Sequence, residues 1–358
     1  MYSLHKLTGE KSAKKALDRY TGIAVYWSCR EARSVPKGLR PSSADYPKRS
    51  GKTMKKVGFI GLGIMGKPMA LNLLKAGTAL MVSDLNPAAV AELTAAGAEA
   101  GSYREIGAAC DAVITILPNG AIVQDVLFGE NGVASALTPG KIVCDMSSVT
   151  ADESRTCYRK LEEIGCAFLD APVSGGEPGA IAGTLAIMCG GDEPAFEAMQ
   201  PIFEVLGSSA LLIGPSGSGS VTKLANQVIV NLNIAAVSEA LVLAAKCGAD
   251  PMKVYRAIRG GLAGSAVLDA KAPMMCARNF KPGGKISINH KDIKNVLATA
   301  HSVDVPMPFT AQLFEVQQAL KVGGHMDDDH SGYVQYFEQL AGITIQSPEF
   351  SKKECEEK

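Results

Sequence analysis

The fold is decided by residues 55–66, which read KKVGFIGLGIMG. Residues 57–60 have the apolar pattern of a buried strand, glycines follow with the spacing G-x-G-x-x-G, and residues 68–77 are typical of a helix that ends at glycine. This spacing allows a tight turn, close approach of a pyrophosphate to the backbone, and close packing of helix on strand. The helix N-terminus also offers free N–H groups to phosphates. We therefore expect a dinucleotide to contact Gly61, Leu62, Gly63, Ile64, Met65 and Gly66.

The residue that ends the next strand indicates which dinucleotide is bound. Residues 79–83 have a strand pattern and run into Asp84, about 20 residues past the first glycine, where a carboxylate accepts hydrogen bonds from the adenosine ribose hydroxyls. A carboxylate repels a 2′-phosphate, and no arginine follows it, because the next residues are Leu85, Asn86 and Pro87. NAD(H) is therefore the expected cofactor, and NADP(H) is the alternative if another loop supplies a cation.

Strands and helices continue to alternate further along the chain. Strand patterns occur at 112–118, 141–145 and 167–170, with a helical pattern at 152–164. Strands separated by helices of this length predict an α/β doubly wound parallel sheet with helices on both faces. Ligands of such sheets lie beyond the carboxyl ends of the strands. Four residues at these ends are expected cofactor contacts: Leu117, Pro118, Ser147 and Ser148. A simple strand end is the alternative for the first two.

A serine–glycine–glycine turn follows the strand at 167–170. Ser174, Gly175 and Gly176 place a hydroxyl beside consecutive backbone N–H groups, which suits binding of a carboxylate or carbonyl oxygen. An ordinary glycine turn is the alternative, and the turn taken alone favours it. Residues elsewhere in the chain are needed to distinguish a binding turn from an ordinary glycine turn.

A long apolar helix is expected at about 221–247, after the glycine- and serine-rich run at 214–220. Lys223, Gln227 and Asn231 recur every fourth residue and so form one polar stripe along it. A lysine on so apolar a helix is costly unless it faces a cleft or a partner. A lysine that extends its amine to solvent from the helix start is the alternative. The glycine-rich run, at the junction of two domains, favours a site.

The length of the chain and the distribution of its charges indicate how it is divided into domains. Its 358 residues predict two domains, 54–218 with the alternating pattern and 219–345 with helices only, followed by a charged tail at 346–358. Residues 1–53 hold twelve Lys and Arg against four Asp and Glu and lack a sustained period. We expect a disordered extension there, or an upstream start to a protein that begins at Met54. An organellar transit segment is the alternative.

Composition also excludes several classes of protein. Lys and Arg number 36 and so do Asp and Glu, which argues against a nucleic-acid partner. Polar or glycine residues interrupt every apolar run, so no membrane span is expected. The nine cysteines include no Cys-x-x-Cys pair, which disfavours a disulfide scaffold and a zinc site and favours a reducing, cytoplasmic location. No metal site is expected, because residues 325–330 (HMDDDH) read as a solvated loop. Lys291 and Asp292 read as a salt bridge that opens a helix.

Six ordered motifs carry a resemblance to a known family. GLGIMG at 61–66, then LP, DMSS, DAPVSGG, GSGSVTKLANQ and NHKD occur in the order and spacing of the β-hydroxyacid dehydrogenases, over about residues 55–343. The resemblance implies a Rossmann domain and an all-helical C-terminal domain, joined by the helix that begins near residue 219. It also implies a homodimer or homotetramer assembled through the helical domains.

The resemblance further implies roles for individual residues. Lys223 matches the family's catalytic lysine, which gives a proton to the carbonyl oxygen, and Lys291 matches the lysine near the nicotinamide. Residues 174–176 match the substrate-binding turn. Many members have asparagine four residues after the catalytic lysine, whereas this chain has Gln227 with Asn226 beside it. Both amides are therefore taken as candidate substrate contacts.

The run at 260–286 is most similar to family members that reduce tartronate semialdehyde to glycerate. That reaction on a small hydroxyacid or semialdehyde is the expected function. 3-Hydroxyisobutyrate, threonate or succinic semialdehyde chemistry on the same lysine is one alternative, because pocket shape rather than fold separates these substrates. A non-catalytic dinucleotide-binding scaffold is the other, and the intact lysine and Ser-Gly-Gly turn argue against it.

Overall fold

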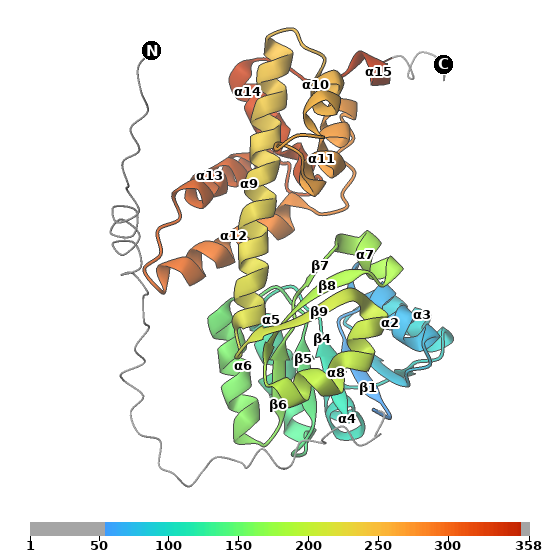
Figure 1. Cartoon of the computed structure of the whole chain (residues 1–358). Helices are drawn as coiled ribbons and strands as arrows, with labels where there is room; N and C mark the ends of the chain where they lie inside the picture. The colour runs from blue at the N-terminus through green and yellow to red at the C-terminus, as the bar shows by residue number, and fades with distance from the viewer. Residues whose placement is uncertain (1–53, 352–358) are drawn as a thin grey trace, which may run out of the picture. The chain divides into compact units, whose positions relative to one another are not determined.

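The computed structural model describes residues 54–351, so the extension expected at 1–53 and the end of the expected tail, 352–358, lie outside the described residues. A mostly parallel sheet flanked by helices comes first in the described chain, and helices alone follow it (Figure 1). The predicted fold class, a Rossmann-type doubly wound sheet followed by an all-helical part, is confirmed.

The described strands form one sheet in the order β3-β2-β1-β4-β5-β6-β8-β7, with β9 paired to β8. Their bounds are β1 Val57–Ile60, β2 Leu80–Ser83, β3 Glu99–Ala100, β4 Ala112–Thr115, β5 Ile142–Asp145, β6 Ala167–Asp170, β7 Val173–Ser174, β8 Leu185–Gly191 and β9 Gly207–Gly214. Strands β1 to β6 pair in parallel. β8 runs antiparallel to β6 and β7, which departs from the all-parallel prediction. The connection from β7 to β8 is about ten residues long, shorter than the dozen or more of a parallel crossover.

Helices cover both faces of this sheet (Figure 1). Their bounds are α2 Gly66–Lys75, α3 Pro87–Ala95, α4 Tyr103–Ala109, α5 Gly120–Phe128, η1 Val133–Ala136, α6 Ala151–Glu163, α7 Gly176–Ala182 and α8 Glu193–Leu206. One core cluster joins Phe59 of the sheet to α2, α3, α7 and α8, for example through Leu73. The neighbouring strand residue Ile60 belongs to a second cluster with α4, α5 and α6, which includes Ile106. Consecutive strand residues point to opposite faces, so both faces are apolar.

Glycines let the long helix α9 (Ser218–Lys246) begin directly against the sheet. Asp170, the last residue of β6, caps this helix, because its Oδ1 accepts a hydrogen bond from Gly217 N at 2.7 Å and its Oδ2 accepts one from Ser220 N at 2.8 Å. A Cβ at Gly219 would overlap carbonyl oxygens of β6 and β8. The glycine- and serine-rich run therefore serves close packing at the start of α9, where Lys223 lies one turn further on.

The helical part packs around α9 (Figure 1). Its other elements are α10 Pro251–Ile258, α11 Ala266–Ala277, α12 Ile286–His301, α13 Pro308–Val322, η2 His330–Tyr333, α14 Val334–Ala341 and α15 Pro348–Ser351. The prediction that Lys291 and Asp292 open a helix is wrong, because α12 begins at Ile286 and places them in its second turn. The earlier start is set by a distant segment, since Ile286 N donates a hydrogen bond to Asp328 O and Ser287 N donates one to Met326 O.

By length and composition alone, α9 could cross a membrane, which the sequence analysis did not anticipate. Its polar stripe, Lys223, Gln227 and Asn231, is buried within the described chain. The helix packs against α11, α12, α14 and the sheet. Because the polar residues face these neighbours, we interpret α9 as a core helix of this part of the protein.

Candidate active site

In the glycine loop between β1 and α2, two of the three glycines are required by the packing of the protein itself, and the third is not. Gly61 has a φ of +101°, which favours glycine, and a Cβ there would overlap the carbonyl oxygen of Ile116. A Cβ at Gly66 would overlap the carbonyl oxygen of Gly61. Gly63 is exposed, and a Cβ there would meet no protein atom within 4 Å. The loop therefore packs tightly against the protein at Gly61 and Gly66, and it leaves space for a ligand at Gly63.

Asp84 ties the glycine loop to the end of β2. Its Oδ2 accepts a hydrogen bond from Leu62 N at 2.5 Å, and its Oδ1 accepts one from Asn86 N at 2.7 Å. Each carboxylate oxygen retains a lone pair for a further donor. The next residue, Leu85, is 91% exposed and carries no charge. The two remaining loop residues lie at the start of α2: exposed Ile64 and half-buried Met65.

A buried carboxylate supports the segment that follows β4. Asp145 ends β5 with 1% exposure, and its Oδ1 accepts hydrogen bonds from Ser147 Oγ at 2.5 Å and Thr115 Oγ1 at 2.8 Å. Ser147 Oγ in turn accepts a hydrogen bond from Leu117 N at 2.8 Å. Burial raises the pKa of Asp145 to about 6, although these hydrogen bonds oppose the shift. Asp145 thus orients Leu117, and exposed Pro118 beyond it, at the carboxyl edge of the sheet.

The Ser-Gly-Gly turn runs from the last residue of β7, Ser174, to the first residue of α7, Gly176. Gly175 has a φ of +138° and Gly176 a φ of +63°, which favour glycine, and both residues are exposed, whereas Ser174 is half-buried. A Cβ at Gly176 would lie 4.0 Å from the carbonyl oxygen of Gly283. The turn therefore lies beside the loop that precedes α12.

Lys223 is a buried amine, with 8% of its residue surface exposed. Burial lowers its pKa, Asp292 opposes that effect, and Lys291 adds to it. Within residues 54–351, the amine donates no hydrogen bond to another protein group. A desolvated amine with uncommitted protons is suited to hydrogen bonding and proton transfer with a bound molecule.

Asp292 is the centre of the polar network around Lys223. Its Oδ2 accepts a hydrogen bond from Gln227 Nε2 at 2.6 Å, and Lys291 Nζ forms an ion pair with its Oδ1 at 3.0 Å. Lys291 Nζ also donates a hydrogen bond to the carbonyl oxygen of Ser148 at 2.7 Å. The structure therefore brings together four residues that were predicted as site residues from distant parts of the sequence: Ser148, Lys223, Gln227 and Lys291.

The two amides predicted to bind substrate differ in their contacts. Gln227 directs its amide hydrogens at α12, because Nε2 donates to Asp292 and lies 3.4 Å from Asn289 Oδ1. Asn226 is half-buried and donates a hydrogen bond from Nδ2 to Gln227 Oε1 at 3.0 Å. Gln227 thus belongs to the network around Lys223, and Asn226 adjoins it. Their contact with substrate stays a prediction.

Comparison with known proteins adds a family to this geometry. A family model for the NAD binding domain of 6-phosphogluconate dehydrogenase matches residues 56–214, and one for NAD-binding of NADP-dependent 3-hydroxyisobutyrate dehydrogenase matches residues 217–337. The chain is 44% identical over 286 residues to 2-hydroxy-3-oxopropionate reductase of Escherichia coli strain K12, a match that covers 80% of this chain and 98% of that protein. The chain belongs to the 3-hydroxyisobutyrate dehydrogenase family.

Other members of the 3-hydroxyisobutyrate dehydrogenase family are similar over nearly their whole lengths. The 2-(hydroxymethyl)glutarate dehydrogenase of Eubacterium barkeri is 39% identical over 295 residues, which cover 81% of this chain and 97% of that protein. The solved structure of Mycobacterium tuberculosis 3-hydroxyisobutyrate dehydrogenase with L-serine is 30% identical, with a TM-score of 0.73 and coverage of 79% and 98%. The chain is therefore an NAD(P)-binding oxidoreductase that acts on CH–OH groups, while the names of its relatives differ in substrate.

The residues of this family member fit a nicotinamide dinucleotide. The open position at Gly63 lets a pyrophosphate approach the backbone without displacing a side chain. The lone pairs of Asp84 suit ribose hydroxyls, and Leu117 and Pro118 lie at the carboxyl edge where doubly wound sheets bind ligands. These residues would hold the dinucleotide, together with Lys291, whose amine bonds to the Ser148 carbonyl oxygen.

Sequence reasoning missed Asp292 and Asn289 as site residues. It interpreted Asp292 as part of a plain salt bridge, and the ion pair with Lys291 exists, but its Asp292 carboxylate is buried and acts on Lys223. Asn289 and Asp292 are three residues apart on α12 and share a face, which is a signal that could have found them. The predicted helix began at Lys291 and therefore left Asn289 out. The observed helix α12 begins at Ile286 and contains both residues.

The interpretation of residues 325–330 as a solvated loop is wrong for its last two residues. Asp329 is fully buried and His330 is half-buried, because Lys271 and the backbone of the loop before α12 bond to Asp329. Among residues 54–351, no group of three or more His, Cys, Asp or Glu side chains could hold a metal ion. Asp329 is therefore a buried anchor of the helical part.

Proposed function

We propose that this chain reduces tartronate semialdehyde (2-hydroxy-3-oxopropanoate) to glycerate with NADH, and catalyses the reverse reaction. The observation that carries the proposal is the buried Lys223 amine, with a lowered pKa, beside Asp292 and Lys291. The choice of substrate is supported by the relative that is 44% identical and bears the name 2-hydroxy-3-oxopropionate reductase.

Lys223 is the proposed proton donor of the reduction. When bound, the reduced nicotinamide supplies the hydride that the aldehyde carbon accepts. Negative charge then grows on the carbonyl oxygen, where the Lys223 amine donates a hydrogen bond and then a proton. A donor placed in advance at such an oxygen contributes about 2.7–4 kcal/mol. Because burial lowers the pKa of Lys223, the amine can release a proton in reduction and take one up in oxidation.

The Ser-Gly-Gly turn is the proposed site for the substrate carboxylate. Gly175 and Gly176 have conformations that expose successive backbone N–H groups, and Ser174 adds a hydroxyl. A carboxylate held there is fixed at one end, while Lys223 holds the carbonyl oxygen. Lys291, bonded to Ser148 O and paired with Asp292, keeps the cofactor side of the site ordered.

We further infer that NADH is preferred over NADPH. The 2′-phosphate of NADPH would approach the carboxylate of Asp84, which would repel it. The residue that follows, Leu85, is almost fully exposed and supplies no cation for the phosphate.

Exposed apolar residues on α9 support an oligomer. Ile229 is 68% exposed and Leu243 is 67% exposed. Leu243 lines a hollow with Phe337 and Leu340 of α14. Apolar surface of this kind is typical of contacts between subunits. We infer a homodimer or homotetramer assembled through the helical part, which sedimentation velocity would test directly.

The proposed function is tested by a substrate panel followed through NADH absorbance at 340 nm. The panel contains tartronate semialdehyde, succinic semialdehyde, methylmalonate semialdehyde and 2-formylglutarate, each at the same concentration. We expect kcat/KM for tartronate semialdehyde to exceed the others by at least about tenfold. A higher value for another aldehyde would refute the proposed substrate. NADH binding without turnover of any of the four compounds would also refute the proposed substrate.

A further inference from the structure

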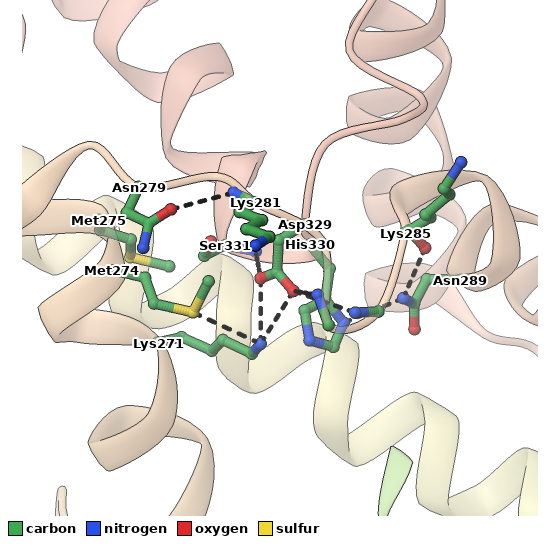
Figure 2. Close-up of polar contacts among 12 residues, drawn as sticks. Lys271, Met274, Met275, Asn279, Lys281, Lys285, Asn289, Asp329, His330 and Ser331 are labelled. Carbon is green, nitrogen blue, oxygen red and sulfur yellow. Dashed lines mark hydrogen bonds and ion pairs between the residues drawn. The ribbon is translucent and has the colours of Figure 1, made fainter. Parts of the chain in front are cut away.

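His330 connects the loop before α12 to the network around Lys223. Its neighbour Asp329 anchors the backbone of that loop: Asp329 Oδ2 accepts hydrogen bonds from Gly283 N at 3.0 Å and Gly284 N at 3.1 Å. Lys271 Nζ lies 3.0 Å from the other carboxylate oxygen of Asp329 (Figure 2). The backbone is therefore held by Asp329, and the His330 ring makes a separate contact with α12.

The proton on the His330 ring can be placed from hydrogen-bond chemistry. Asn289 Nδ2 donates to the Lys285 carbonyl oxygen at 3.1 Å and lies 2.9 Å from His330 Nδ1 (Figure 2). A carbonyl only accepts and an NH₂ group only donates, so Nδ1 is the acceptor and the ring proton resides on Nε2. Burial and the Lys271 charge lower the pKa of His330 to about 4, although Asp329 opposes them. The ring is therefore neutral at neutral pH.

The other end of the Asn289 amide faces the active site. With its NH₂ group at His330, its Oδ1 faces Gln227, whose Nε2 lies 3.4 Å away. Gln227 Nε2 also donates to Asp292 Oδ2, and a carboxylate only accepts. Each amide therefore has a single orientation that satisfies the groups on both sides. His330 fixes the orientation of the Asn289 amide, and Asp292 fixes the orientation of the Gln227 amide.

Asp292 links the two amides to Lys223, because its negative charge acts on the Lys223 amine. Among the described residues, Asp292 and Lys291 are the charged groups that act on the Lys223 amine. The hydrogen bond from Gln227 Nε2 supplies one donor to the Asp292 carboxylate and offsets part of its negative charge. If this bond is weakened, Asp292 attracts the Lys223 proton more strongly, and the pKa of Lys223 rises.

We propose that His330 is a positioning residue for the reaction: by accepting a hydrogen bond from Asn289, it fixes the amide of Gln227 that bonds to Asp292 beside Lys223. This inference rests on the proposed role of Lys223 as proton donor. Without an acceptor at His330, the NH₂ group of Asn289 keeps only its hydrogen bond to the Lys285 carbonyl oxygen, so the amide turns more easily and presents its NH₂ group to Gln227. The two NH₂ groups then face each other, and the bond from Gln227 to Asp292 is disturbed.

Three variants separate this role from a merely structural one. In His330→Asn the acceptor oxygen is bonded to Cγ, as Nδ1 is in histidine, so the hydrogen bond from Asn289 is retained. In His330→Gln the oxygen is bonded one carbon further out, near the position of Nε2, so the same amide chemistry is present but misplaced. His330→Leu removes the acceptor altogether.

The measurement is the pH dependence of Lys223 acetylation by acetic anhydride, read by mass spectrometry of the Lys223 peptide from the full chain. This readout requires no turnover, so its failure is distinguishable from failure of the proposed function. We expect the pKa of Lys223 to rise by about 0.5 unit in His330→Gln and His330→Leu, and to stay at the wild-type value in His330→Asn. Glycerate oxidation at pH 7 should then fall in the first two variants, by at most about threefold, as the neutral amine becomes scarcer.

Several outcomes would overturn the proposal. One is that Lys223 titrates alike in the wild type and all three variants. Another is that His330→Asn shifts the pKa of Lys223 as far as His330→Gln does. A loss of thermal stability shared by the variants, with no change in the Lys223 titration, would make His330 a structural residue only.

Discussion

The replacement Asp145→Asn should stabilise the protein increasingly as the pH rises. Asp145 ends β5 almost completely buried, and its Oδ1 accepts hydrogen bonds from Thr115 Oγ1, Ser147 Oγ and Ser147 N. An asparagine Oδ1 can accept the same bonds, because the exchange leaves the size and shape of the side chain nearly unchanged. The exchange therefore removes the buried charge and keeps the support for Leu117.

The sign and size of the effect follow from the pKa of Asp145, which burial raises to about 6 in the folded protein. A carboxyl whose folded pKa is raised contributes its full stability below the unfolded pKa of about 3.9, and this contribution is lost as the pH rises through 6. The shift corresponds to roughly 3 kcal/mol in total, of which about 1.4 kcal/mol accrues between pH 5 and pH 8. Asparagine has no such loss.

Urea unfolding followed by circular dichroism at pH 5 and pH 8 measures this difference. The free energy of unfolding of Asp145→Asn, relative to wild type, should be larger at pH 8 than at pH 5 by about 1.4 kcal/mol. Thr115→Val is the control, because it removes one hydrogen bond to the same oxygen without removing the charge. A difference that is independent of pH in Asp145→Asn would refute the reasoning.

The remaining predictions concern the cofactor site. Gly63→Ala should leave the melting temperature unchanged, because its Cβ meets no protein atom within 4 Å, but it should weaken NADH binding about tenfold in a fluorescence titration. Gly66→Ala should lower the free energy of unfolding by about 1–3 kcal/mol or more, because its Cβ overlaps backbone, and equal effects in the two variants would contradict the loop geometry. Asp84→Ser with Leu85→Arg should move the ratio of kcat/KM toward NADPH. A wild-type protein that already prefers NADPH severalfold would contradict the interpretation of Asp84.

The first half of the fold could be predicted because its signals are local. The strand at 57–60, the glycine spacing and the helix that follows are continuous in sequence, and each restricts the backbone by itself. The antiparallel pairing of β8 was missed for the opposite reason. It depends on which strand edge is available after β6, and no local pattern records that.

The candidate site was predictable where one residue type dominates the chemistry. Lys223 stood out because an amine on an apolar helix is costly to bury. Asp292 and His330 did not stand out, because their importance depends on partners that are distant in the chain: Gln227 lies 65 residues from Asp292, and Asn289 lies 41 residues from His330. Their local sequence, a Lys-Asp pair and an acidic loop, is equally typical of a solvated surface.

The measurement that tests the central claim most directly is turnover of Lys223→Ala, because Lys223 is the proposed proton donor. The variant is compared with wild type in tartronate semialdehyde reduction, and NADH affinity is measured by fluorescence. Lys246→Ala is the matched control, because Lys246 lies on the same helix, is exposed, and donates a hydrogen bond to the Ala341 carbonyl oxygen.

We expect Lys223→Ala to lower kcat at least about 100-fold, as loss of a preorganised donor does, while the Kd for NADH stays within about twofold. The glycine loop and Asp84 are untouched by the change, so cofactor binding should persist. Lys246→Ala should keep the wild-type kcat. A near-normal kcat in Lys223→Ala would contradict the assignment of this lysine as the proton donor.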